Sequence, residues 1–464
     1  MNAWELADWD AVETSERVKR REVSVAEVVE AAITRARDAA HLGAIVTPTF
    51  ERAREAAAKS SKGPLAGVPT FIKDLVQVAG VRTSWGTAAS GHYVSSRSEP
   101  SVLAMERTGL ISLGKSATPE LGLTGTTEPL AFGACRNPWN PKYSAGGSSG
   151  GAAALVASGV VPLAHASDGG GSVRIPASCC GLVGLKVSRG RMDMEGSNLL
   201  PVNIAVHGVV SRSVRDTVAF WDAVEGQLGS RRLPPIGALS STPGKLRIAA
   251  YFDSPMGQPV HPDARAATER AMKWCEQLGH EVQPIACPVD RQVTEDFLRM
   301  WGFIAFAQAR AGRVLMHRGF DSSKLERWTT DFSRYFSSDL RASFTAIRRL
   351  RGFAQTWAKV MEKYDVVLSP TLAEPPALLG HLQTDQPFEL LFARLISFTP
   401  FTVAMNASGA PALSLPMGHS AEGLPMGVQL AGAHGSERTL LELGRALEEA
   451  NPWQKAAPRT AWRG

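Results

Sequence analysis

The sequence predicts a mixed α/β protein in which one body contains all 464 residues. Between 64 and 82 the chain carries short apolar runs bounded by glycine and proline, the pattern of buried strands. Such runs then alternate with stretches in which the apolar residues are spaced with the period of a helix, as in an α/β architecture. No internal repeat or low-complexity tract interrupts the alternation, and the hydrophobic content of 44% is ordinary for a globular core. We therefore expect a single domain over 1–464.

Local signals indicate the elements of the first half. Residues 12–58 predict two helices, and Ser24-Val-Ala-Glu27 forms a capping box at the start of one of them. From 64 to about 225, short strands alternate with glycine-rich turns and helices of small residues. Ala152–Ala157 is one of these helices.

The second half repeats this alternation with larger helices. Leu246–Tyr251 is typical of a strand, 261–278 of a helix, and 291–363 is largely helical. Two further strands, Ala412–Leu415 and Met426–Ala431, precede an amphipathic helix over roughly 436–450. The segment 291–363 is rich in large aromatic residues, for which core packing is the favoured explanation and a substrate pocket the alternative: Trp301, Phe303, Phe306, Trp328, Phe332, Tyr335 and Phe344.

Charge and cysteine content exclude several classes of function. The net charge of +6 is small for this length and the basic residues are scattered, so we expect no nucleic-acid partner. The five cysteines have no metal-ligand spacing, which indicates reduced thiols, no metal site and a cytoplasmic protein. The N-terminus MNAWELADWD lacks the features of a signal peptide, and no apolar stretch reaches the length of a membrane span.

Two serines inside glycine clusters are the strongest candidates for chemistry. Ser148 lies in Gly146–Gly151, and Ser172 follows three consecutive glycines. Glycine lets the backbone approach a ligand closely and turn successive N–H groups toward an anion. The two clusters therefore predict a nucleophile and its anion cradle, with the first cluster at a helix N-terminus.

Two other motifs match in letters but not in context. Gly109–Ser116 fits the phosphate-loop pattern, yet its intervening residues are typical of a strand and Pro119 stands where a helix is required. Gly146–Gly150 fits the nucleophile-elbow pattern, yet Asn137–Lys142 is predicted as a loop rather than the strand that such an elbow follows. His207, a candidate base for that elbow, lacks a persuasive acidic partner.

A serine hydrolase with a lysine base is the third interpretation. Lys73 is flanked by apolar residues in Val68–Val76, on a predicted buried strand. Burial disfavours the ammonium form and lowers the pKa of the amine, which makes a proton acceptor of it. From residue types alone, an ion pair between Lys73 and Asp74 at a strand end is the favoured alternative.

Long and specific motifs, each different from the others, are distributed along the chain: Gly67–Asp74, Gly114–Gly122, Arg136–Gly151, Ser167–Lys186, Ser369–Thr371, Phe398–Thr402, Asn406–Pro416 and Gly423–Leu430. Together they resemble the amidase signature family, whose members hydrolyse carboxylic amides with a Ser–cis-Ser–Lys triad. The similarity covers nearly the whole chain and weakens around 230–365. It implies the family fold, a large mixed twisted β-sheet covered by helices on both faces. It also implies a signature core at about 64–225 and a variable, largely helical pocket region at about 290–365.

Position by position, the resemblance implies a role for each residue of the triad. Ser172 is the nucleophile, Ser148 the serine of the family's cis peptide and Lys73 the base. Neutral Lys73 accepts a proton through Ser148 while Ser172 attacks the amide carbonyl, giving an acyl-enzyme that water hydrolyses. The oxyanion hole is formed by the backbone N–H groups of Gly169, Gly170 and Gly171, together with that of Ser172.

The resemblance also implies supporting residues and shows one departure. The expected supporting serines are Ser149 and Ser167, which form hydrogen bonds. Asp168 and Arg174 are expected to form an ion pair that holds the loop, and Gly122 and Leu123 are the expected pocket positions near 120–130. The family stretch T-D-T/I-G-G-S reads Ser167-Asp-Gly-Gly-Gly-Ser here. Because Gly169 removes a side chain beside the oxyanion hole, we expect a more open acyl pocket or a looser loop.

The predicted function is hydrolysis of a small-molecule amide without a cofactor, with aryl, aliphatic and cyclic amides left open as substrates. The alternative is the A subunit of a tRNA-dependent amidotransferase, which shares the triad and supplies ammonia within a complex. The Gly-Gly-Gly variant and the adjacent Cys179-Cys180 favour a free-standing amidase. The expected partners are the amide substrate and, as an open option, a second copy of the chain; neither nucleic acid nor membrane is expected.

Overall fold

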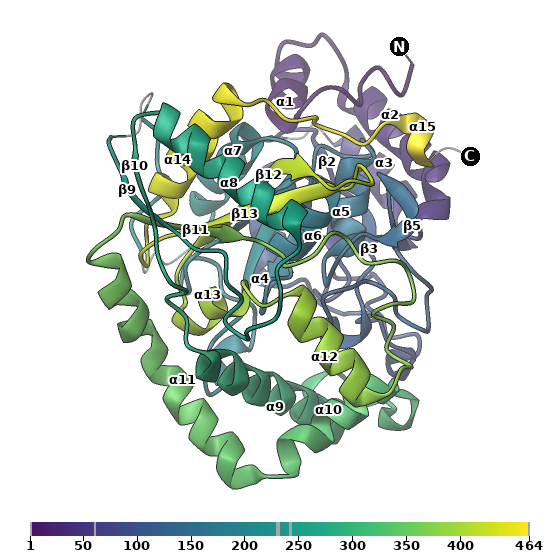
Figure 1. The fold of residues 1–464 in the computed structure, drawn as a ribbon. Coiled ribbons are helices and arrows are strands. Elements are labelled where there is room, and N and C mark those ends of the chain that lie inside the picture. Colours follow the sequence, from purple (N-terminus) through teal and green to yellow (C-terminus); the bar gives the residue numbers. More distant parts are fainter. Residues whose placement is uncertain (1, 60–61, 229–232, 241–243, 463–464) are drawn as a thin grey trace.

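The computed structural model describes all residues except 1, 60–61, 229–232, 241–243 and 463–464. An eight-stranded sheet of mixed orientation runs through it, which confirms the predicted α/β class (Figure 1). β9 pairs in parallel with β10 and β11, and the other neighbours are antiparallel. In spatial order the strands are β10 (Glu281–Pro284), β9 (Arg247–Ala250), β11 (Val366–Pro370), β13 (Pro425–Ala431), β12 (Ala412–His419), β7 (Val183–Lys186), β8 (Val206–Ser211) and β6 (Leu163–Asp168).

Helices cover both faces of this sheet, as the resemblance implied. Successive side chains of a strand point to opposite faces, and on β12 Leu413 and Leu415 enter one hydrophobic cluster whereas Ala412 enters another. The first cluster includes α7 (Val214–Glu225), α8 (Pro262–Gln277) and α14 (Glu437–Ala450). The second includes α9 (Arg291–Leu315), α11 (Leu340–Met361) and α13 (Val403–Ser408).

Smaller elements complete the region that was predicted as the signature core. A three-stranded sheet is formed by β1 (Ile45–Pro48), β3 (Ile111–Ser116) and β2 (Pro69–Lys73), with α4 (Pro100–Arg107) between the last two in sequence. The loop predicted at Asn137–Lys142 is wrong, because β4 (Arg136–Asn137) pairs with β5 (Asn140–Ser144). The Asn137 side chain closes this hairpin by accepting the N–H of Trp139. Helices α5 (Gly150–Ala157) and α6 (Arg174–Cys180) follow the two glycine clusters.

The N-terminal region contains three helices where the sequence predicted two: α1 (Ala11–Lys19), α2 (Val25–Asp38) and α3 (Phe50–Ala58). The capping box predicted at Ser24 is present, with reciprocal hydrogen bonds to Glu27. The missed helix α1 has a local cap, because the Asp10 side chain accepts the N–H of Glu13, and also a distant partner, because the Asp216 carboxylate accepts the N–H groups of Ala11 and Val12. A contact between such distant residues leaves no local pattern.

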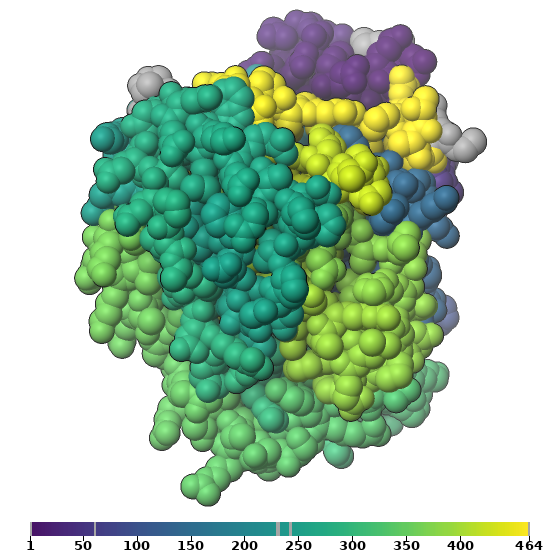
Figure 2. All heavy atoms as spheres, in the orientation of Figure 1, coloured from purple at the N-terminus to yellow at the C-terminus, as the bar shows by residue number. Residues whose placement is uncertain are grey.

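The two ends of the chain lie at the same end of the molecule (Figures 1 and 2). The rings of Trp4 and Trp462 are 5.7 Å apart, which joins the N-terminal arm to the last helix, α15 (Arg459–Trp462). At the opposite end, α9, α10 (Arg327–Ser337) and α11 form a helical layer with α12 (Phe388–Phe398) beside it. This layer confirms the prediction for 291–363. Within the described part of the chain, no helix combines the length and apolarity needed to cross a membrane.

Candidate active site

Lys73 is the last residue of β2 and is completely buried. Strand β2 lies against β6, which brings Lys73 Nζ to 2.8 Å from Ser148 Oγ and 3.1 Å from Ser167 Oγ. The favoured alternative of an ion pair with Asp74 is wrong. Asp74 is paired with Lys115 Nζ at 2.8 Å, and both side chains are buried. The neighbouring carboxylate therefore has its own cation, and the Lys73 amine faces two serine hydroxyls.

The surroundings of Lys73 favour its neutral form. Burial lowers the pKa of Lys73 to about 7, against the opposing attraction of Asp168. The backbone N–H of Lys73 donates to His165 Nδ1 at 3.2 Å, and His165 Nε2 lies 3.1 Å from His207 Nδ1. Burial also lowers the pKa of both imidazoles, that of His207 to about 3. The two histidines are neutral, so His165, with the rejected candidate base His207 behind it, holds the lysine backbone without adding charge.

The first glycine cluster is shaped by close backbone contacts around Ser148. The peptide bond between Gly147 and Ser148 is cis, the conformation that the resemblance implies there. A Cβ at Gly147 would lie 2.3 Å from the carbonyl oxygen of Thr126, so only glycine fits. Ser149 Oγ lies 3.3 Å from both the N–H and the carbonyl oxygen of Ser167. Ser149 thus ties the start of α5 to the end of β6.

The turn that carries Ser172 is organised by a buried ion pair. Asp168 and Arg174 are fully buried and 2.9 Å apart, so the predicted pair is present. Burial raises the pKa of Asp168, but the Arg174 guanidinium outweighs burial and holds that pKa well below its ordinary value. The Asp168 carboxylate also accepts the N–H groups of Gly171 at 2.7 Å and Val173 at 3.2 Å. The carboxylate therefore fixes the backbone on both sides of Ser172.

The hydrogen bond from the N–H of Gly171 to Asp168 contradicts one part of the predicted oxyanion hole. The N–H of Gly171 is engaged by Asp168 and is not available for the role expected of it. The N–H groups of Gly169, Gly170 and Ser172 have no acceptor among the residues that the structure describes. The hydroxyl of Thr402 donates to the Gly170 carbonyl at 2.7 Å and steadies this backbone. Three N–H groups remain for an anion, one from Ser172 and two from glycines.

Polar residues from the C-terminal part of the chain hold Arg174, and the sequence did not single them out. The guanidinium donates to the Thr402 carbonyl at 2.8 Å, to Gln429 Oε1 at 2.6 Å and to Asn406 Oδ1 at 2.7 Å. Asn406 in turn donates to Asp168 Oδ1 at 2.9 Å. The signal that could have found them is the buried polar character of their motifs, because a buried polar group needs a partner.

A cavity of about 80 Å³ opens beside Ser172. Its walls are aromatic, aliphatic, glycine, proline and threonine residues from the glycine-rich turn, α9, α10, α12 and the segment near 123–125. Among the residues that the structure describes, no aspartate, glutamate, lysine, arginine or histidine lines it. The cavity therefore fits an uncharged group.

The two pocket positions predicted near 120–130 have different places. Leu123 lines the cavity, and its carbonyl accepts the indole N–H groups of Trp301 and Trp328, each at 3.2 Å. Gly122 is not part of the lining. A Cβ there would lie 3.3 Å from Ser148 Oγ, so Gly122 packs against the serine beside Lys73.

Comparisons with known proteins fit this geometry. A family model described as Amidase matches residues 27–441. "Putative amidase AmiC" of Mycobacterium tuberculosis (strain ATCC 25618 / H37Rv) is 42% identical over 464 residues, covering 98% of each protein. The 6-aminohexanoate-cyclic-dimer hydrolase of Pseudomonas sp. (strain NK87) is 35% identical, covering 97% of this chain and 96% of that protein. The chain belongs to the amidase signature family.

As a member of that family it is an amidase, an enzyme that hydrolyses the C–N bond of carboxylic amides. A solved structure of 6-aminohexanoate cyclic dimer hydrolase complexed with substrate matches it with a TM-score of 0.90 and 32% identity, covering 99% of this chain and 100% of the other. A solved glutamyl-tRNA(Gln) amidotransferase component from Thermotoga maritima matches with a TM-score of 0.73 and 24% identity, covering 99% of this chain and 97% of the other, which shows a shared fold alone. The amidotransferase alternative is therefore not the better supported one.

Of the seven aromatic residues singled out in 291–363, five serve one of two purposes in this amidase, whereas Phe344 is exposed and contradicts both explanations. Trp301, Trp328 and Phe332 line the cavity, so the pocket alternative holds for these three. Phe303 and Phe306 pack against the buried Phe336 instead, as the core explanation expects. Phe297, Phe392 and Leu395 also line the cavity, although the sequence did not single them out.

The expectation that Gly169 opens the acyl pocket is wrong. A Cβ at Gly169 would lie 3.1 Å from the ring of Trp301, so the indole occupies the space that the missing side chain leaves. The loop is not loose either, because the Gly170 carbonyl is bound by Thr402. The glycine and the tryptophan fit each other.

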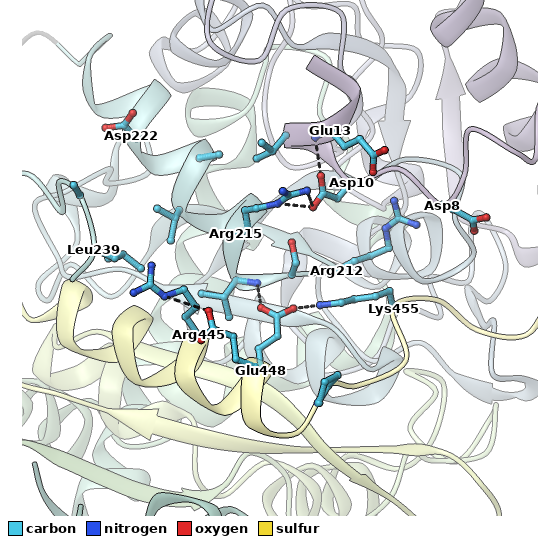
Figure 3. Close-up of a pocket in the computed structure, with 18 of the residues that line it drawn as sticks. Asp8, Asp10, Glu13, Arg212, Arg215, Asp222, Leu239, Arg445, Glu448 and Lys455 are labelled. Carbon is cyan, nitrogen blue, oxygen red and sulfur yellow. Dashed lines mark hydrogen bonds and ion pairs between the residues drawn. The ribbon is translucent and has the colours of Figure 1, made fainter. Parts of the chain in front are cut away.

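A larger cavity of about 750 Å³ lies elsewhere and shares no lining residue with the one beside Ser172 (Figure 3). Charged side chains line it, and several of them form ion pairs: Arg215 with Asp10, and Lys455 with Glu448. These pairs connect the N-terminal arm, α7, α14 and the C-terminal tail. The charged groups of this larger cavity hold these segments together, and none of these groups lines the cavity beside Ser172.

Proposed function

We propose that this amidase hydrolyses an uncharged, largely apolar carboxylic amide, linear or cyclic, through an acyl-Ser172 intermediate. The observation that carries the proposal is the 2.8 Å distance between Lys73 Nζ and Ser148 Oγ in a buried site. Because burial lowers the pKa of Lys73 to about 7, the amine can accept a proton at neutral pH. A lysine kept charged by a carboxylate would lack this capacity.

The proposed reaction is an acyl transfer in two steps. Neutral Lys73 accepts the hydroxyl proton of Ser148, Ser148 accepts that of Ser172, and Ser172 Oγ attacks the carbonyl carbon. The N–H groups of Gly169, Gly170 and Ser172 bind the oxyanion. The C–N bond then breaks, the leaving nitrogen takes the proton back through the relay, and the acyl group remains as an ester on Ser172. Water, deprotonated by the same relay, hydrolyses the ester and releases the acid.

The lining of the cavity supports an uncharged substrate. An ionised group placed there would be buried without an opposite charge, which costs several kcal/mol. One relative is named as a hydrolase of the cyclic dimer of 6-aminohexanoate. This compound contains two amides and methylene chains and no ionisable group, so it meets the requirement for an uncharged substrate. Simple aliphatic and aryl amides fit it too. Glutamine does not, because its ammonium and carboxylate groups both need partners.

A substrate panel tests this proposal. We expect the purified enzyme to hydrolyse hexanamide, benzanilide or the cyclic dimer with a kcat/KM at least about 100-fold above that for glutamine, since an unpaired buried charge costs several kcal/mol. Ser172→Ala controls for contaminating hydrolases. A preference for glutamine would contradict the proposal and favour the amidotransferase alternative.

We also propose that the chain forms one domain and works in a reducing compartment such as the cytoplasm. The first part is supported by the central sheet, whose strands come from both halves of the chain. The second is supported by the cysteines, all five of which are free thiols and four of which are buried. Limited proteolysis tests the first part, because two domains would yield two stable fragments.

A further inference from the structure

Two aromatic rings of α9 press directly on the glycine run before Ser172. The rings of Phe297 and Trp301 are 5.6 Å apart and nearly parallel, at 22°. A Cβ at Gly169 would lie 3.1 Å from the Trp301 ring, and one at Gly170 would lie 3.3 Å from the Phe297 ring. Neither glycine has a backbone conformation that only glycine adopts. A side chain at Gly169 would therefore crowd the indole, which would have to move by a few tenths of an ångström.

The indole of Trp301 is fixed in this position. Its N–H donates to the Leu123 carbonyl, on another wall of the same cavity. Trp328, from α10, donates to the same carbonyl and also lines the cavity, but none of its atoms is among the three nearest to a Cβ at Gly169. To retreat from the glycine run, Trp301 would have to give up its hydrogen bond and its stacking on Phe297. The ring thus forms a rigid wall beside the backbone N–H groups that are free for an oxyanion.

We propose that Gly169 and Trp301 together determine specificity, and that they restrict the acyl group to an uncharged chain without a branch on the carbon next to the carbonyl. This inference rests on the proposed function of Ser172. A carbonyl oxygen bound by the N–H groups at 169 and 170 places its neighbouring carbon beside the same backbone. A wall that is too tight for an unstrained Cβ on that backbone is also tight for a methyl branch on the neighbouring carbon, which has the same size. Unbranched chains pass along the flat ring.

Two chromogenic substrates test the inference: hexanoyl 4-nitroanilide and its 2-methylhexanoyl analogue. We expect the wild type to prefer the unbranched substrate by about 10- to 200-fold in kcat/KM, the usual discrimination for one methyl group in an apolar pocket. Trp301→Leu should reduce this ratio at least fivefold. Phe303→Leu is the matched control, since it removes an aromatic ring from the same helix, packs against Phe336 and does not line the cavity. Its ratio should stay within twofold of the wild type.

A double-mutant cycle tests the contact itself. Gly169→Ala should lower kcat/KM for both substrates at least tenfold, because the new methyl displaces the indole. Adding Trp301→Leu should restore most of that loss, whereas adding Phe303→Leu should not. Gly352→Ala controls for the glycine substitution, because a Cβ at that helical position meets nothing within 4 Å. Labelling of Ser172 by a fluorophosphonate in every variant shows whether the site is still assembled.

The outcomes separate this inference from the function on which it rests. Labelling of Ser172 together with an unchanged branched-to-unbranched ratio in Trp301→Leu overturns the inference alone. So does an equal change in Phe303→Leu, or labelling without any hydrolysis of the hexanoyl substrate. Absence of both labelling and hydrolysis in the wild type overturns the proposed function. A ratio that falls only in Trp301→Leu, with rescue of Gly169→Ala, supports the inference.

Discussion

Replacing Lys73 with methionine should change how the stability of the protein depends on pH. Burial lowers the pKa of Lys73 from 10.5 to about 7 in the folded state, whereas in the unfolded chain the pKa is that of a free lysine, about 10.4. Between these values the unfolded state binds one more proton than the folded state. The contribution of Lys73 to the free energy of unfolding is therefore lowest below pH 7 and increases as the pH rises toward 10.5. Lys73→Met removes this dependence.

The expected size follows from the shift. Each pH unit between about 7 and 10 changes the free energy of unfolding of the wild type, relative to Lys73→Met, by about 1.4 kcal/mol. From pH 7.5 to pH 9.5 the difference between the two proteins should grow by about 2.5 kcal/mol in favour of the wild type. Hydrogen bonds and packing lost in the variant shift the whole difference by a constant, but they do not alter its slope. All other titrating groups are shared and cancel.

The assay is urea unfolding of both proteins at half-unit steps from pH 7 to pH 9.5, followed by tryptophan fluorescence. Lys273→Met, at an exposed position on α8, controls for the loss of a lysine as such. Parallel curves for the wild type and Lys73→Met would refute the reasoning, because they would mean that Lys73 has the same pKa in the folded and unfolded states. An inverted slope would mean that the folded state raises this pKa, as a buried carboxylate partner does.

Three further substitutions test other parts of the site. Ser148→Ala should lower kcat about 100- to 10,000-fold with little change in KM, measured on any accepted amide, because it removes the proton relay but not the nucleophile. Asp168→Ala should lower the free energy of unfolding by about 3–5 kcal/mol in urea titrations, since it leaves Arg174 buried without its counter-charge; a loss below 1 kcal/mol would contradict this. Gly171→Ala should destabilise by about 1–3 kcal/mol in thermal unfolding, because φ is +129° and its Cβ would lie 2.5 Å from Thr402 Oγ1; an unchanged melting temperature would show that the turn tolerates a side chain.

Much of the site could be predicted because its residues carry local signals. The apolar run around Lys73 indicated a buried strand, and a buried lysine has a lowered pKa. The glycine clusters indicated where backbone contacts are closest, and Gly147 indeed has no room for a side chain. The ion pair between Asp168 and Arg174 joins residues six apart, within one turn and helix start. Such features depend on neighbours in the sequence.

The remainder depended on contacts between distant segments. Lys73 faces the serines rather than Asp74 because Lys115 pairs with Asp74. Lys115 lies in the motif that fits a phosphate loop in letters but not in context. The N–H of Gly171 is the exception, because its acceptor, the Asp168 carboxylate, lies only three residues earlier, and no pattern in the sequence shows which N–H that carboxylate binds. The meeting of Gly169 with Trp301 joins residues more than a hundred positions apart, and no local pattern reports it. The functional groups carry local signals, whereas the contacts of Lys115 and Trp301 do not.

The assignment of the nucleophile is tested most directly by covalent labelling with a fluorophosphonate followed by peptide mass spectrometry. Trypsin cleaves after Lys142 and Arg174, so Ser148 and Ser172 fall on one peptide and fragment ions must separate them. We predict a single adduct on Ser172, formed faster as pH rises through 7 and absent in Ser172→Ala. An adduct on Ser148, or undiminished labelling of the Ser172→Ala protein, would contradict the account.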